Sequence, residues 1–217
     1  HEKINKLIKK INEKIENVLF ESLNLNNIVT EKKCQKTGIC KINFKANNVV
    51  GLNILIKKNF LNYNNLTKLF FILKNQIMFL KKNNIGVLFF SLDDIVFIEN
   101  NKNTYFLFLN SNNLFEIEEE MVITKSFEKK NPNNFLAPEL LTINSIPFNI
   151  NYNCSFFSLA SLIAFCIKGQ KVDIFNPINW NIDDFKVLLQ SIKNTKLYWT
   201  LLRCQELDPN NRYLLWI

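Results

Sequence analysis

Histidine and arginine are almost absent from this sequence of 217 residues. The only histidine is His1, and only Arg203 and Arg212 are arginine among 27 basic residues. A Ser-His-Asp triad, a Cys-His pair and a Cys2His2 zinc site each need histidine, so these three chemistries are excluded. The sequence does not begin with methionine, and we therefore expect it to start partway into a longer protein.

Cysteines are few, and long apolar runs are missing. The cysteine count is odd and includes no C-x-x-C pair, which is typical of reduced thiols in an intracellular protein; the five are Cys34, Cys40, Cys154, Cys166 and Cys204. The most apolar segment covers residues 154–167 and is too short to span a bilayer, so it indicates a buried core helix. We find no signal peptide and expect no membrane partner.

Composition and charge allow several partners but favour none. The chain is 47% hydrophobic with 20 Phe, enough for a substantial core, and has only four Gly. Its richness in Asn, Ile, Lys, Leu and Phe resembles the product of an AT-rich genome, which weakens any functional interpretation of the lysines. The net charge of +8 permits an acidic partner. However, the lysines lie in scattered pairs among acidic residues, as on a solvated surface, so nucleic-acid binding is not expected.

The apolar spacing predicts an α+β fold with the helices gathered towards the C-terminus. Residues 2–23 have the single apolar stripe of a packed amphipathic helix, with a short coiled coil as the alternative. A polar segment at 111–136 is expected to be irregular. Further helices are expected at 65–82, 154–168, 182–193 (with Asn181 as its N-cap) and 196–206, and strands at 38–44, 49–56, 85–90, 93–99 and 104–110, the last two joined by a hairpin turn.

Two adjacent carboxylates, Asp93 and Asp94, follow the apolar run at 85–90. They are either the working end of an enzyme or the edge of a hairpin, and the flanking sequence has to decide between the two.

Downstream motifs resemble those of protein kinases. Ala137-Pro138-Glu139 matches the A-P-E that closes the kinase activation segment. The helix at 154–168 resembles the hydrophobic helix of the large lobe: Ser158-Leu159 matches its S-L, and Ser155 stands at its capping Asp. Arg212 falls on the arginine that pairs with the A-P-E glutamate, so the resemblance implies a buried Glu139–Arg212 ion pair. The alternative is two unrelated surface charges.

Upstream motifs extend this resemblance over nearly the whole chain. Glu16 falls on the helix glutamate that pairs with the strand lysine in active kinases, and Asn27-Ile28-Val29 on the N-I-V that follows. The resemblance implies a small-lobe remnant over residues 1–60, formed by this helix and the last two strands, with a hinge at 58–64. It implies a mainly helical large lobe over residues 61–217.

Two parts of a kinase are missing from the chain. No Gly-rich phosphate loop and no V-A-I-K strand lysine precede the helix at 2–23, so these elements lie upstream or are absent. Lys57 in ILIKK mimics the V-A-I-K ending but follows the glutamate helix, so it is not the equivalent residue.

The positions that align with the catalytic residues of kinases are occupied by other residue types. The H-R-D motif aligns with Val87-Leu88-Phe89, which places Phe89 where the proton acceptor should stand, and Ser91 takes the place of the catalytic-loop lysine. Asp94 replaces the metal-binding Asn and keeps oxygen ligands for Mg²⁺. The D-F-G motif aligns with residues 110–112, where Asn110 is a neutral and weaker ligand.

The resemblance therefore implies a pseudokinase, a kinase-like fold that acts as an interaction or regulatory module. The alternative is a divergent active Ser/Thr kinase that uses ATP and Mg²⁺, with Asp93 or Asp94 as a substitute base or metal ligand. A nucleotide-binding but inactive fold lies between the two. We expect a protein partner, either a true kinase or a substrate, with Thr124 and Ser126 as candidate phosphate acceptors. The chain is also similar to kinase-like proteins of large DNA viruses, which implies the host cytoplasm or the virion.

Overall fold

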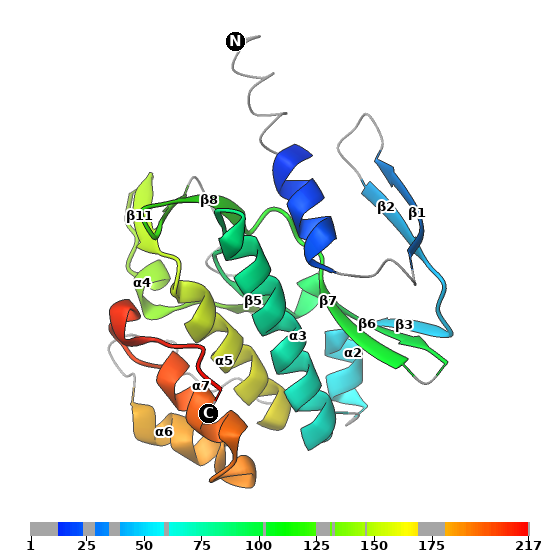
Figure 1. Cartoon of the computed structure of the whole chain (residues 1–217). Coiled ribbons are helices and arrows are strands. Elements are labelled where there is room, and N and C mark those ends of the chain that lie inside the picture. Colours follow the sequence, from blue (N-terminus) through cyan, green and yellow to red (C-terminus); the bar gives the residue numbers. More distant parts are fainter. Residues whose placement is uncertain are drawn as a thin grey trace.

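The computed structural model is a mixed α+β structure (Figure 1). It describes residues 13–23, 29–34, 40–58, 61–101, 103–124, 131, 133–145, 147–168 and 181–216. The expectations for His1, Ser126 and the side chains of Cys34, Cys40 and Thr124 therefore lie outside the described part, as do Asn27 and Ile28.

The first described helix covers residues 13–22 and is followed by a two-stranded antiparallel sheet. Ile15, Leu19 and Leu23 are buried at the spacing of one helix face, which confirms the amphipathic pattern. The sheet joins β1 (Val29–Cys34) to β2 (Cys40–Phe44).

A second sheet has the order β3-β6-β7, formed by β3 (Asn48–Gly51), β6 (Ile95–Asn100) and β7 (Asn103–Phe108). The β6–β7 hairpin was expected, and Asn101 in its turn takes a left-handed φ of 54°. The strand expected at 49–56 is wrong beyond Gly51, because residues 52–57 form helix α2 (Leu52–Lys57). Leu52 and Leu55 are buried on one side of α2, a spacing that a short alternating strand does not give.

Residues 48–57 therefore pack with the C-terminal part of the chain, since β3 pairs with β6 and α2 contacts both β6 and the short 3₁₀ helix η1 (Leu92–Asp94). The β3–β6 pairing therefore crosses the domain boundary expected at residue 60.

The long helix α3 (Tyr63–Lys82) begins two residues before the expected position. The side chain of Asn62 caps it by accepting a hydrogen bond from the Asn65 amide at 2.9 Å. Its buried face includes Leu69, Phe70 and Leu73, and this face packs against α5 and β7.

Residues 114–124 of the segment expected to be irregular form two strands of a four-stranded sheet instead. The order is β11-β9-β8-β4, built from β4 (Ile85–Val87), β8 (Leu114–Glu118), β9 (Met121–Thr124) and β11 (Phe148–Asn151). The β8–β9 turn places Glu119 and Glu120 at left-handed φ values, without the Asn or Gly that such a turn usually needs. No local sequence signal therefore predicts this turn.

A pair of short strands leads into a short helix. β5 (Phe90–Ser91) pairs with β10 (Asn134–Phe135), and the chain then enters α4 (Pro138–Leu141) with Pro at its first turn.

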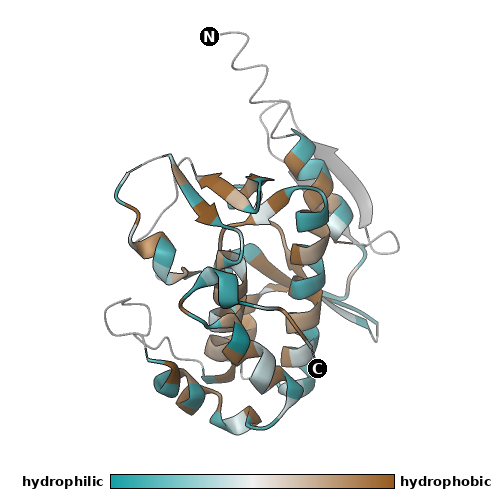
Figure 2. Ribbon diagram, turned by 60° about the vertical axis from the view of Figure 1, so that its left-hand side comes forward, coloured by the Kyte–Doolittle hydropathy of each residue, from teal (hydrophilic) through white to brown (hydrophobic). Residues whose placement is uncertain are grey.

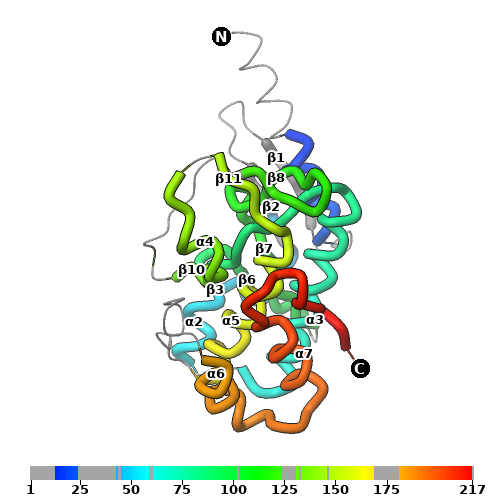
Figure 3. The backbone as a smooth tube through the Cα atoms, turned by 90° about the vertical axis from the view of Figure 1, so that its left-hand side faces the viewer, coloured from blue at the N-terminus to red at the C-terminus, as the bar shows by residue number. Residues whose placement is uncertain are grey.

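The C-terminal part is helical, as expected. It contains α5 (Cys154–Lys168), α6 (Ile182–Leu188), α7 (Lys196–Cys204) and the 3₁₀ helices η3 (Gln190–Ile192) and η4 (Pro209–Asn211). Asn181 caps α6, accepting from the Asp183 amide as predicted. Figure 3 shows α5 in the middle of this part, and its neighbours are α3, α6, α7, β5 and β10.

One large core holds the structure together. It contains residues from the helix at 13–22 through α7, and α5 contributes a nearly continuous buried run. Figure 2 shows apolar colouring gathered in the interior and polar colouring on the outer turns. Among the described helices, none has the length and apolarity needed to cross a bilayer.

Candidate functional site

The loop between β4 and η1 contains the residues aligned with a catalytic loop. Phe89 in this loop is only 3% exposed and belongs to the main core. Three contacts fix the surrounding backbone: the Leu88 amide donates to the Asn113 carbonyl at 2.9 Å, the Phe90 amide donates to Ser158 Oγ at 2.7 Å, and Cys154 Sγ lies 3.2 Å from the Leu88 carbonyl. Position 89 therefore presents no proton acceptor and fills space in the core.

Asp94, at the end of η1, is the centre of a polar cluster. Its Oδ1 accepts from Asn110 Nδ2 at 2.9 Å, and its Oδ2 accepts from Asn113 Nδ2 at 3.1 Å. Its backbone carbonyl also accepts from the Leu109 amide at 3.0 Å. The structure thus brings together Asp94 and Asn110, the two positions assigned to metal binding in the sequence.

The environment of Asp94 disfavours its charge. Partial burial raises the pKa of the carboxyl to about 6; the amide of Asn110 opposes this shift, neighbouring Asp93 adds to it, and the amide of Asn113 opposes it. At neutral pH the group is mostly ionised, and its negative charge is stabilised by two neutral amide donors.

Asp93 faces solvent, as the sequence suggested. It is exposed, and its Oδ2 accepts from Asn133 Nδ2 at 2.8 Å. The two carboxylates of η1 thus have different partners, Asn133 near β10 for Asp93 and the turn after β7 for Asp94.

A metal ion finds few ligands here. Within the described ranges, no three His, Cys, Asp or Glu side chains are grouped so that they could hold one.

Glu16 lies half-buried on the helix over residues 13–22, whose Lys14 forms a 3.2 Å ion pair with Glu116 of β8.

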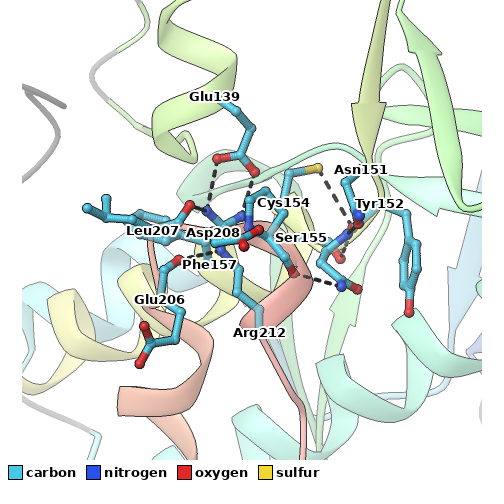
Figure 4. A network of polar contacts seen from close by, with 12 residues as sticks. Glu139, Asn151, Tyr152, Cys154, Ser155, Phe157, Glu206, Leu207, Asp208 and Arg212 are labelled. Carbon is cyan, nitrogen blue, oxygen red and sulfur yellow. Dashed lines mark hydrogen bonds and ion pairs between the residues drawn. The ribbon is translucent and has the colours of Figure 1, made fainter.

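Glu139 and Arg212 form an ion pair (Figure 4). Arg212 Nη1 lies 2.5 Å from Glu139 Oε1, and Nη2 lies 3.0 Å from Oε2. The Arg212 side chain is fully buried and also donates to the carbonyls of Glu206 and Leu207. The expected pairing of these two residues is confirmed, and the alternative of two unrelated surface charges is wrong. Ala137 is buried and Pro138 opens α4, which sets the position of Glu139.

The positions of Ser155 and Ser158 give them structural roles that differ from those expected from the sequence. Ser155 is the second residue of α5 and its hydroxyl bonds to the Tyr152 carbonyl, so it lies inside the helix and not at a cap. Ser158 accepts from the loop at Phe90. Sequence reasoning missed this contact, and it also missed Gln76 and Asn113, because a polar residue among many asparagines gives no signal of its own.

No protein-family model and no curated protein sequence matches this chain.

Proposed function

We propose that this chain is a protein kinase-like domain that has lost catalysis and acts as an interaction or regulatory module. The proposal is supported by the ion pair between Glu139 and Arg212, which joins the two C-terminal motifs of the sequence resemblance. It is also supported by the central position of α5, the helix that resembles the large-lobe helix of kinases.

The strand pairing refines this proposal in the N-terminal part. The two strands after the Glu16 helix are β1 and β2, where the sequence suggested 38–44 and 49–56. The hinge then corresponds to residues 45–51, in place of 58–64, and α2 fills the space before α3. A kinase fold binds ATP between its two lobes and uses a strand lysine to do so. Lys57 cannot supply this lysine, because it lies at the end of helix α2 and not on a strand.

The main support for the proposed loss of catalysis is the presence of Phe89 at the position of the catalytic base. A kinase needs a carboxylate at this position to accept the substrate hydroxyl proton. The buried phenyl ring has no basic atom, and loss of a general base alone reduces rates by roughly 10² to 10⁴. The competing proposal, a divergent active kinase, rests on Asp93 and Asp94, the two carboxylates of η1.

A phosphoryl-transfer assay separates the two proposals. The chain is incubated with labelled ATP, Mg²⁺ or Mn²⁺, and general Ser/Thr protein substrates. We expect no transfer above a heat-denatured sample. Transfer that is lost in Asp93→Ala or Asp94→Ala, but retained in the control Asp184→Ala on the exposed surface of α6, would establish the active kinase instead.

A second assay addresses the regulatory role. Active Ser/Thr kinases are assayed with and without an equimolar amount of the chain, and we expect the rate of at least one to change. If the rate of none of these kinases changes, the proposed regulatory role is refuted, and only the proposal of a kinase-like fold without catalysis remains.

A further inference from the structure

The turn after β7, residues 109–113, is held from two sides. On one side, Gln76 of α3 bonds to both backbone groups of Phe108, donating to its carbonyl at 2.9 Å and accepting from its amide at 3.3 Å. On the other side, Asp94 accepts from Asn110, Asn113 and the Leu109 amide. Between them, Asn110 Oδ1 accepts from the Asn112 amide at 2.8 Å. The turn is therefore fastened at Phe108, Leu109, Asn110 and Asn113.

This hydrogen bonding conflicts with a divalent metal at Asp94. Mg²⁺ binds oxygen ligands, commonly one or two carboxylates together with water or phosphate oxygens. Each Asp94 oxygen already accepts from an amide NH₂ group, and those groups repel a cation. The amide oxygen of Asn110 is directed to the Asn112 amide. Asp93, the nearest second carboxylate in sequence, accepts from Asn133. The residues present do not fit a metal ion.

We propose that Asp94, Asn110 and Asn113 form a metal-independent latch that fixes the turn at 109–113 to η1. The latch consists of one carboxylate and two amide donors, and it holds in place the start of β8. The contacts themselves do not depend on the kinase resemblance. Only the statement that the latch stands where a kinase would bind metal rests on the proposed function.

The physical basis is the distribution of charge. Two carboxylates this close would repel each other and would need a cation between them. With Asn at position 110, one negative charge remains, and neutral amides satisfy it with charge-assisted hydrogen bonds. Asn113 is almost fully buried, so its amide would lose a partner inside the protein if Asp94 were removed.

Hydrogen exchange tests the latch directly. In Asp94→Ala we expect the amides of Leu109, Asn112 and Leu114 to exchange about tenfold faster or more, since each lies in or beside the turn and a hydrogen bond to a charged group is removed. Asp93→Ala is the matched control, because its carboxylate accepts from Asn133, which lies outside the turn, and it should leave these amides unchanged. Unchanged exchange in Asp94→Ala would overturn the latch.

A second variant tests the charge argument. Asn110→Asp keeps an oxygen for the Asn112 amide but replaces the NH₂ group that faces Asp94 with a second carboxylate oxygen. In EDTA, we expect this variant to melt several degrees below the wild type, and equal melting temperatures would count against the proposal.

Metal binding is measured by melting the wild type in EDTA and in millimolar Mg²⁺ or Mn²⁺. The latch predicts the same melting temperature in each solution. A metal-dependent rise that disappears in Asp94→Ala would show a metal site and overturn the latch. These outcomes are independent of the phosphoryl-transfer assay: a chain without transfer and with metal binding refutes only the latch, and a chain with transfer but no metal shift refutes only the proposed function.

Discussion

Arg212 donates from both terminal nitrogens of its guanidinium group to the two carboxylate oxygens of Glu139, across 73 positions of the sequence. The pair joins α4 to the segment after η4, and the Arg212 guanidinium also lies 5.0 Å from the ring centre of Phe157 in α5. Because Arg212 is fully buried, its charge depends on this one carboxylate and on two backbone carbonyls.

Glu139→Ala should strongly destabilise the protein. The substitution leaves a buried guanidinium without its counter-charge, and breaking a buried pair in this way typically costs about 3–5 kcal/mol. Urea unfolding followed by circular dichroism measures the change. The control is Asp183→Ala, which breaks the exposed pair with Lys186 on α6 and should leave the unfolding midpoint nearly unchanged. Equal midpoints for the two variants would show that the Glu139–Arg212 pair contributes little.

Ser158→Ala should destabilise the loop that contains Phe89. The Phe90 amide is buried and donates to Ser158 Oγ, and loss of the acceptor leaves this amide unsatisfied at a cost of about 1–3 kcal/mol. Ser161→Ala on the same helix is the matched control. Its hydroxyl accepts from Gln205, whose amide nitrogen keeps a second acceptor in the Phe157 carbonyl, so a smaller loss is expected. A larger loss in Ser161→Ala would contradict this assignment.

Asp94 should make stability depend on pH in an unusual direction. Its folded pKa, about 6, is raised above the value of 3.8 in an unfolded chain, so the folded protein binds more protons between these values. The stabilisation is fully present below about pH 4 and is lost as the pH rises through 6. Because the group is partly exposed, we expect only about 1–2 kcal/mol after solvent screening.

The measurement is the unfolding free energy of the wild type minus that of Asp94→Asn, at a series of pH values from 4 to 8. Taking the difference removes the contributions of the other carboxylates, because they are common to both proteins. We expect the difference to fall as the pH rises. A difference that stays flat, or rises, would mean that burial does not control the charge of Asp94.

The sequence predicted the helices and the long-range ion pair well. Apolar spacing located α3 and α5 to within two residues, since a buried helix face imposes a strong period. The Glu139–Arg212 pair was predictable only because both residues belong to recognisable motifs. Whether these motifs come from kinases stays a prediction.

The β8–β9 hairpin and α2 could not be predicted from local signals. The hairpin turn uses Glu119 and Glu120 where Asn-Gly would be typical, so the hairpin depends on pairing with strands distant in sequence, β4 and β11. The segment at 49–56 is apolar apart from Gly51 and Asn53, and a short, mostly apolar run does not distinguish a strand from a buried helix. Asp94 was a candidate in the sequence, but its partner Asn113 was one asparagine among many.

Gly86→Ala tests the position of the hairpin against β4. Gly86 pairs with Phe115 of β8, and a methyl group on its Cα would lie 2.8 Å from Val122 Cγ2 and 3.2 Å from Ile117 Cγ1. Val122 is fully buried, so the neighbouring side chains have little room to move, and we expect a loss of about 1–3 kcal/mol. Chemical denaturation and hydrogen exchange in residues 114–124 measure the effect.

Gly51→Ala is the matched control for this substitution. Gly51 has a φ of −67°, which any residue adopts, and the added methyl group would meet only the side-chain end of Asn53, which can rotate away. Its unfolding midpoint should therefore stay close to that of the wild type. If Gly86→Ala were tolerated equally well, the hairpin formed by β8 and β9 would not pack against β4, and the segment at 111–136 would be irregular after all.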